Sequence, residues 1–185
     1  MGNGDCQCPK VDLDDWRDRE VSLAGHSFLA APTLLLLHVP RRLYHDLGAL
    51  ETRIAASRYR ATGGPLVMHR DAWFSGEVLL SIDPQTEPRP EIRSFQNLFY
   101  SRVVDRPGFE AALREMPRFY RDLAKAGVGR IASMYFWYLS CPRCLIARGA
   151  QQIILMAQST RLLEAAPCPL EDSRNRARLA LPCQT

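Results

Sequence analysis

Apolar residues recur at steps of four, three and four in two stretches of the chain. The two sets follow Pro40 and Pro107, and they are Leu43, Leu47, Leu50 and Ile54, then Phe109, Leu113, Met116 and Tyr120. This spacing places each set along one side of a helix. Proline is common in the first turn of a helix, which favours helices over residues 40–58 and 107–125. Pro117 is expected to kink the second helix, because proline lacks the amide that the helix needs at that position.

Shorter apolar runs flank both helices and predict β-strands. The runs around the first helix cover residues 28–39, 66–70 and 77–82, and those around the second cover 92–104, 130–139 and 151–158. The order strand, helix, strand, strand therefore occurs twice, which indicates an internal duplication.

This duplication sets the expected domain organisation. We predict one domain over residues 16–158, made of repeats at about 20–83 and 91–158, with a flexible arm at 1–15 and a disordered tail at 159–185. One repeat alone cannot bury the stripe of its helix, so the two should share a sheet and a core. The predicted fold class is α+β, an antiparallel sheet with both helices on one face and a ligand groove on the other.

Composition and charge narrow the classes of partner. The 185 residues carry a formal net charge of +4, and the chain has no helix-turn-helix, aromatic RNA-binding signature or basic helix. The start, Met1 to Lys10, is polar and unlike a signal peptide. The longest apolar run, residues 28–39, is too short to cross a bilayer. We therefore expect a cytoplasmic protein that binds neither nucleic acid nor membrane and needs no cofactor.

The six cysteines add one metal hypothesis. Cys141 and Cys144 have the two-residue spacing of a zinc knuckle, which supplies two of four ligands. Cys6 and Cys8 could supply the others if the arm folds back. A redox pair and an ordinary turn are the alternatives for Cys141 and Cys144. A zinc-containing interaction protein therefore stays open as a hypothesis.

Candidate binding residues lie on the strands that follow each helix. If Glu77 faces a groove near Trp73, Tyr135 and Trp137, its carboxylate and the aromatic faces suit a cationic ligand. His69 lies on the neighbouring strand and could form a general acid–base pair with Glu77. The alternative assigns ordinary roles to these residues, namely a solvated glutamate, core aromatic residues and a histidine with its hydrogen bonds satisfied.

The order of these elements resembles that of the gyrase-inhibitor-like (GyrI-like) small-molecule-binding family over roughly residues 20–158. The matching segments are Gly64-Pro65-Leu66-Val67-Met68-His69-Arg70, Gly76-Glu77-Val78-Leu79-Leu80, Pro107-Gly108-Phe109-Glu110-Ala111-Ala112-Leu113 and Met134-Tyr135-Phe136-Trp137-Tyr138-Leu139. Many members carry a buried glutamate on the second aromatic strand, whereas no acidic residue lies between Arg130 and Ala150 here. Glu77 is the remaining candidate for binding a cation.

The resemblance implies two functions. The first is that of an effector-binding or multidrug-binding domain, which sequesters or senses an aromatic or cationic amphipathic compound, as a homodimer or with a partner regulator. The alternative is a hydrolase that opens strained alkylating natural products in the same groove. In that case Glu77 would be the catalytic base, and Trp73 or Trp137 would hold the substrate.

Overall fold

The computed structural model describes residues 8–62, 66–85, 87, 89–149 and 152–162. A 3-10 helix (Leu13–Trp16) precedes the elements of the first half, β1 (Arg19–Ser22), β2 (Ser27–Leu36), β3 (Val39–Pro40), α1 (Leu43–Ala56), β4 (Val67–Arg70) and β5 (Ser75–Ile82). The second half contains β6 (Ile92–Ser94), β7 (Asn97–Val103), α2 (Phe109–Lys125), β8 (Ile131–Tyr138), α3 (Pro142–Arg148) and β9 (Ile153–Leu162). None of the described helices is long and apolar enough to span a membrane.

The strands form one antiparallel sheet in the order β1-β7-β9-β8-β4-β5-β2-β3, and β6 pairs with the start of β2. β4 and β8 meet at the centre, with Val67 opposite Tyr138. Outward from this pair, β5 and β2 on one side correspond to β9 and β7 on the other. The sheet order thus repeats the duplication seen in the sequence, and the predicted α+β class is confirmed.

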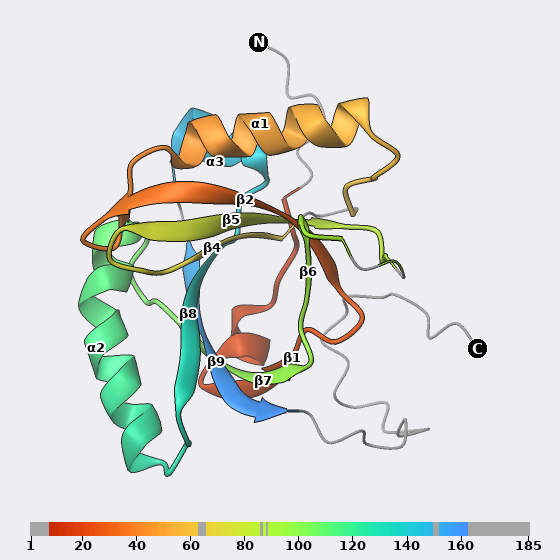
Figure 1. Ribbon diagram of the computed structural model, residues 1–185. Helices are drawn as coiled ribbons and strands as arrows, with labels where there is room; N and C mark the ends of the chain where they lie inside the picture. Colours follow the sequence, from red (N-terminus) through yellow and green to blue (C-terminus); the bar gives the residue numbers. More distant parts are fainter. Residues whose placement is uncertain (1–7, 63–65, 86, 88, 150–151, 163–185) are drawn as a thin grey trace.

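The two faces of the sheet are covered differently. α1 and α2 pack on one face, the helix face, where Leu47 and Phe119 join a core with Val67 and Phe136. In Figure 1, α1 lies across β2 and β5, and α2 runs beside β8. The opposite face, the second face, carries another buried cluster, which includes Trp16, Leu23, Phe28, Phe95, Phe99, Tyr135 and Trp137. The N-terminal segment, residues 8–16, packs against this cluster through Val11, Leu13 and Trp16, so that part of the expected ligand groove is filled.

Two predicted strands are each divided in the structure. The run 28–39 forms β2 and β3, because Leu37 and His38 make a turn in which Leu36 pairs with Val39. Leucine and histidine are not typical hairpin residues, which is why this turn is not predicted from the sequence. The run 92–104 forms β6 and β7, since β6 pairs with β2 whereas β7 pairs with β1 and β9.

The connection after β8 is a helix and not the ordinary turn considered for Cys141 and Cys144. Pro142 occupies the first turn of α3, and Gly149, with a φ of 74°, ends it. The last strand extends to Leu162, beyond the predicted end at residue 158. The predicted tail beyond residue 162 and the turn at residues 63–65 lie outside the described residues.

Candidate functional site

An apolar pocket opens on the helix face where several elements end. The pocket has a volume of about 260 Å³ and is lined by Val39, Pro40, Arg41, Leu43, Tyr44, Phe109, Tyr138 and Leu145. These residues come from β3, the start of α1, the start of α2, the end of β8 and α3. We call this cavity the aromatic pocket. Most of its lining is uncharged, which suits a hydrophobic group.

A histidine held by a carboxylate lies beside this pocket. Nδ1 of His38 is 2.8 Å and 3.0 Å from the two carboxylate oxygens of Asp71. His38 directly precedes Val39 of the pocket lining, and the Trp73 ring lies 4.9 Å from the His38 ring. Asp71 follows β4, where its amide donates to the Met134 carbonyl at 2.8 Å. A carboxylate on Nδ1 fixes the orientation of an imidazole and leaves Nε2 to act on a substrate.

The turn that carries His38 has an unusual backbone. Leu37 and His38 have φ values of 50° and 73°, although neither is glycine. Such conformations cost roughly 1–3 kcal/mol each and persist only where the surroundings hold them. Here the Leu35 and Leu37 amides donate to the Phe74 and Trp73 carbonyls at 2.9 Å and 3.0 Å. The two hairpin ends are thereby joined, and His38 is aimed at Asp71.

A second histidine supports the floor of the pocket. The Tyr138 hydroxyl lies 2.8 Å from Nδ1 of His69, whose ring is fully buried and stacks on Phe136 at 4.7 Å. Burial, assisted by the charge on His38, lowers the pKa of His69 to about 3. His69 is therefore neutral at pH 7 and shares one hydrogen bond with the Tyr138 hydroxyl. Its Nε2 has no hydrogen-bond partner among the described residues.

The charges of this region act on one another. Burial raises the pKa of Asp71, and the hydrogen bond from His38 opposes that shift. Burial and then the Asp71 charge raise the pKa of Tyr120. Burial raises the pKa of Tyr138 as well, and the charges of Tyr44 and Asp71 add to the shift. These residues therefore belong to one electrostatic neighbourhood around the aromatic pocket.

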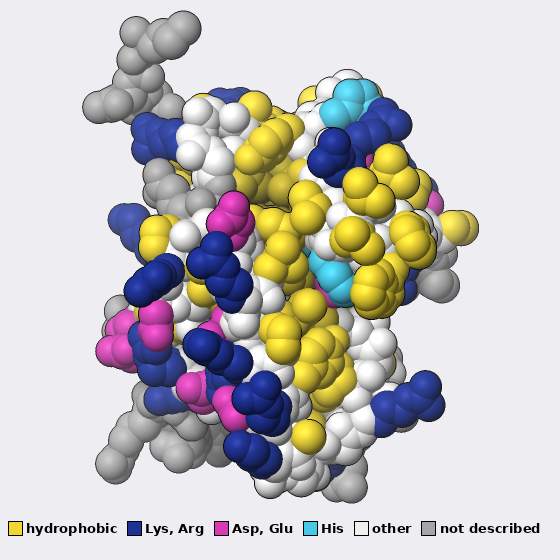
Figure 2. Space-filling view, turned by 90° about the vertical axis from the view of Figure 1, so that its left-hand side faces the viewer, with side chains coloured by type: hydrophobic (Ala, Val, Ile, Leu, Met, Phe, Trp, Pro, Cys, Tyr) yellow, Lys and Arg dark blue, Asp and Glu magenta, His cyan; other side chains and the backbone are white. Residues whose placement is uncertain are grey.

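Exposed apolar side chains surround the histidine and its carboxylate. Those at the two hairpin ends are Leu34, Leu36, Leu37, Trp73 and Phe74, each about half exposed or more. Figure 2 shows hydrophobic side chains gathering over this face, with a histidine among them. A patch of this kind is typical of a binding surface for an apolar compound.

The predicted site residues divide between the two faces. Trp73 and His69 both lie near His38 on the helix face. Glu77 lies on the second face, where its carboxylate is 2.6 Å from Arg93 and 3.6 Å from Arg70. In the register of β4 and β5, His69 is opposite Val78, and Glu77 is opposite Arg70. The expected acid–base pair of His69 and Glu77 is therefore not formed, because their side chains leave opposite faces.

Tyr135 and Trp137 share the second face, as alternation predicts, and both are buried. The Trp137 ring meets the Trp16 ring edge-on at 4.6 Å, and Phe95 and Phe99 pack around Tyr135. Burial raises the pKa of Tyr135 to about 12. These two residues serve the core in this structure, and a ligand-binding role for them stays a prediction.

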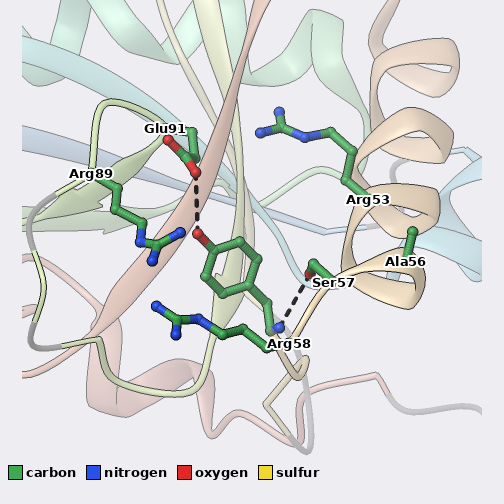
Figure 3. A pocket seen from close by; sticks show the side chains of 7 residues that line it. Arg53, Ala56, Ser57, Arg58, Arg89 and Glu91 are labelled. Atoms are coloured by element: carbon green, nitrogen blue, oxygen red, sulfur yellow. Dashed lines mark hydrogen bonds between the residues drawn. The ribbon is translucent and has the colours of Figure 1, made fainter.

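Another cavity lies at the far end of α1, with a volume of about 540 Å³. Figure 3 shows its lining, Arg53, Ala56, Ser57, Arg58, Tyr59, Arg89 and Glu91. The Tyr59 hydroxyl donates to Glu91 at 3.1 Å, and Arg58 and Arg89 both bind Glu87. The guanidinium groups suit an anion, but this lining presents no histidine or cysteine for proton transfer or attack.

Three cysteines form a separate cluster. The sulfur atoms of Cys8, Cys141 and Cys144 all lie within 4.8 Å of one another. The expected return of the arm toward Cys141 is found at Cys8, whereas Cys6 lies outside the described residues.

His38, Asp71 and Tyr44 were absent from the sequence-based candidates. His38 falls near the end of the run 28–39 that predicts a strand, and Asp71 lies between the runs 66–70 and 77–82. The available signal was a polar residue directly after four leucines, Leu34–Leu37, and directly before Val39-Pro40. His38 and Asp71 are separated by 33 residues in the chain, and only the pairing of the hairpins brings them into contact.

A histidine held by a carboxylate next to an apolar pocket is one arrangement that can transfer a proton to or from water. A family model described as "Bacterial hydrolase" matches residues 2–159. The chain belongs to this bacterial hydrolase family. Searches of curated proteins and of solved structures return no match.

Proposed function

We propose that the protein is a hydrolase in which His38 is the general base, Asp71 orients it, and the aromatic pocket holds an uncharged hydrophobic substrate. The contact of 2.8 Å between His38 and Asp71 beside this pocket is the observation that carries the proposal. Membership of the bacterial hydrolase family supports hydrolysis over simple binding.

The proposed reaction uses water as the nucleophile. Neutral His38 keeps its proton on Nδ1, donated to Asp71, and Nε2 accepts a proton from water. The water oxygen attacks the electrophilic carbon of the substrate, and the bond from that carbon to the leaving group breaks. His38 then returns the proton to the leaving atom. Arg41, which also lines the pocket, is placed to stabilise negative charge that develops during the attack.

The lining favours substrates that carry an uncharged hydrophobic group. Tyr44, Phe109, Tyr138 and Leu145 offer apolar surface, and a cavity of about 260 Å³ accepts a ring or a short chain. The apolar rim at the hairpin ends extends this surface outward. Esters, lactones and strained alkylating rings that carry a hydrophobic group fit these properties. The resemblance to GyrI-like proteins favours the strained rings.

Hydrolysis of p-nitrophenyl esters of increasing chain length, and of a spirocyclopropane alkylator, tests the proposal. We expect His38→Gln and Asp71→Asn to lower kcat/KM by about 10²–10⁴-fold, because each removes general-base catalysis. His45→Gln is the matched control, since the His45 side chain is exposed and contacts Asp46 instead.

Two outcomes would contradict the proposal. Full activity in His38→Gln would remove His38 as the base. Tight binding of the panel by the unchanged protein without turnover would assign it to sequestration or sensing of small molecules. Glu77→Gln tests the two faces of the sheet against each other. A loss of turnover in this variant alone would show that the catalytic base is Glu77 on the second face and not His38.

A further inference from the structure

The three clustered cysteines come from distant parts of the chain. Cys8 belongs to the N-terminal segment, whereas Cys141 and Cys144 lie at the start of α3. Their sulfur atoms all lie within 4.8 Å of one another. Cys141 is buried, and Cys8 and Cys144 are partly buried. Cys8 is 133 residues from Cys141 in the chain, so its approach to Cys141 and Cys144 is not a consequence of local chain geometry.

Local structure prepares these sulfurs for a cation. The Cys141 amide lies 3.2 Å from the Cys8 sulfur, to which it donates. This hydrogen bond joins the N-terminal segment to the start of α3. Pro142 and Arg143 turn the chain into α3, so Cys144 returns to the same side as Cys141. Burial of several thiolates together requires a cation to offset their charge.

The spacing fits zinc. With Zn–S bonds of about 2.3 Å in a tetrahedral site, two sulfur ligands stand about 3.8 Å apart. The three sulfurs, all within 4.8 Å of one another, are close to this spacing. Thiolate donors select zinc over magnesium or calcium, which require oxygen ligands.

We propose that Cys8, Cys141 and Cys144 bind one zinc ion, which acts as a structural cross-link. Each thiol releases its proton when it binds the metal, and a fourth donor completes the tetrahedron. The ion joins the N-terminal segment to α3. Leu145, next to Cys144, lines the aromatic pocket, so the metal also fixes one wall of that pocket. This proposal is independent of which residue acts as the catalytic base.

The full chain, produced with zinc in the medium and purified in a reducing buffer without chelator, tests the proposal. We expect elemental analysis to find about one zinc ion per chain. Replacement of zinc by cobalt(II) should give a thiolate-to-cobalt charge-transfer band. Cys8→Ser and Cys144→Ser should each lose most of the metal and the band, and His45→Gln, at an exposed residue of α1 outside the cluster, is the control that keeps both.

The cobalt titration of the unchanged protein keeps the test valid if a variant fails to fold. Absence of zinc together with absence of the charge-transfer band would overturn the proposal. A disulfide between any two of these cysteines in the purified, unreduced protein, found by mass spectrometry of its peptides, would overturn it too, since that bond consumes the ligands. Retention of zinc by both Cys8→Ser and Cys144→Ser would place the metal elsewhere.

Discussion

The two faces of β4 and β8 use neighbouring residues of the same strands for different purposes. On the helix face, His69 and Tyr138 form a buried hydrogen-bonded pair under the aromatic pocket. On the second face, Met68 and Trp137 are buried in a continuous apolar cluster. A step of one residue along a strand therefore separates the candidate site from pure core.

The difference arises from what covers each face. The helices touch the sheet along their apolar stripes, and the ends of α1, α2 and α3 leave a hollow beside β8. The N-terminal segment covers part of the second face, where Trp16 packs edge-on against Trp137, and a cavity of about 260 Å³ remains beside Glu77 and Arg93. Chemistry is therefore expected at the ends of helices and hairpins, where polar groups can meet without displacing the core.

The largest expected effect is a difference in stability between variants of two tryptophans, one on each face. Trp137→Ala should lower the free energy of unfolding by about 3–5 kcal/mol, because it removes a large side chain from a closed core. Trp73→Ala should cost less than about 1 kcal/mol, since the Trp73 side chain is mostly exposed beside His38. Urea unfolding of both variants measures this. Equal losses of stability would show that the two faces do not differ in the way described.

The next effect is the pH dependence of stability that arises from His69 on the helix face. The pKa of His69 is about 3 in the folded protein, whereas the pKa of an unperturbed histidine is 6.5, so the unfolded chain binds more protons between these two pH values. The contribution of His69 to stability is thus complete above pH 6.5 and falls by about 1.4 kcal/mol per pH unit below it. The raised pKa of Asp71 acts in the opposite direction, because the folded state then retains a proton that the unfolded state releases.

Unfolding measured from pH 7 down to pH 4 tests this slope. His69→Gln should flatten it, whereas His45→Gln, a change at an exposed residue of α1, should leave it as it is. His26, whose pKa burial also lowers, contributes equally in both variants. An unchanged slope in His69→Gln would mean that this ring is charged in the folded protein.

A smaller effect is expected from the carboxylate of the second face. Glu77→Gln weakens the contacts to Arg93 and Arg70 and should cost about 1–2 kcal/mol of stability, since the pair is partly buried. It should leave kcat/KM unchanged if the base is His38. Glu110→Gln is the matched control, because its pair with Arg114 is exposed on α2 and should be worth about 0.5 kcal/mol or less. Urea unfolding and the ester assay together measure both effects.

The smallest effect is a gain at the strained turn. Leu37→Gly should raise the free energy of unfolding by about 0.5–1 kcal/mol, because glycine adopts a φ of 50° without steric cost. Leu36→Gly, one residue earlier in β2, should lower it, since an extended strand residue gains nothing from glycine. Thermal melts compare the two. If both variants were more stable than the unchanged protein, the cause would be the removal of an exposed apolar side chain and not the loss of backbone strain.

The sequence determined the elements and their symmetry. The repeated steps of four, three and four predicted α1 and α2, and the strand runs predicted the duplicated α+β sheet, because burial requires regular alternation along each element. Alternation also assigned Tyr135 and Trp137 to one face together. The turn at His38 was not predicted, since Leu37 and His38 are not typical turn residues. α3 was not predicted either, although Pro142 and Gly149 are typical at the two ends of a helix, because its seven residues are too few for a clear apolar stripe.

Only the tertiary structure decided which face carries the candidate site. Alternation states that Glu77 and Val78 point in opposite directions, but it does not say which direction is covered by helices. The pairing of β4 with β8, the return of Cys8 to Cys141 and the contact of His38 with Asp71 join residues far apart in the chain. Such contacts depend on how whole elements pack, and local pattern contains no information about that packing.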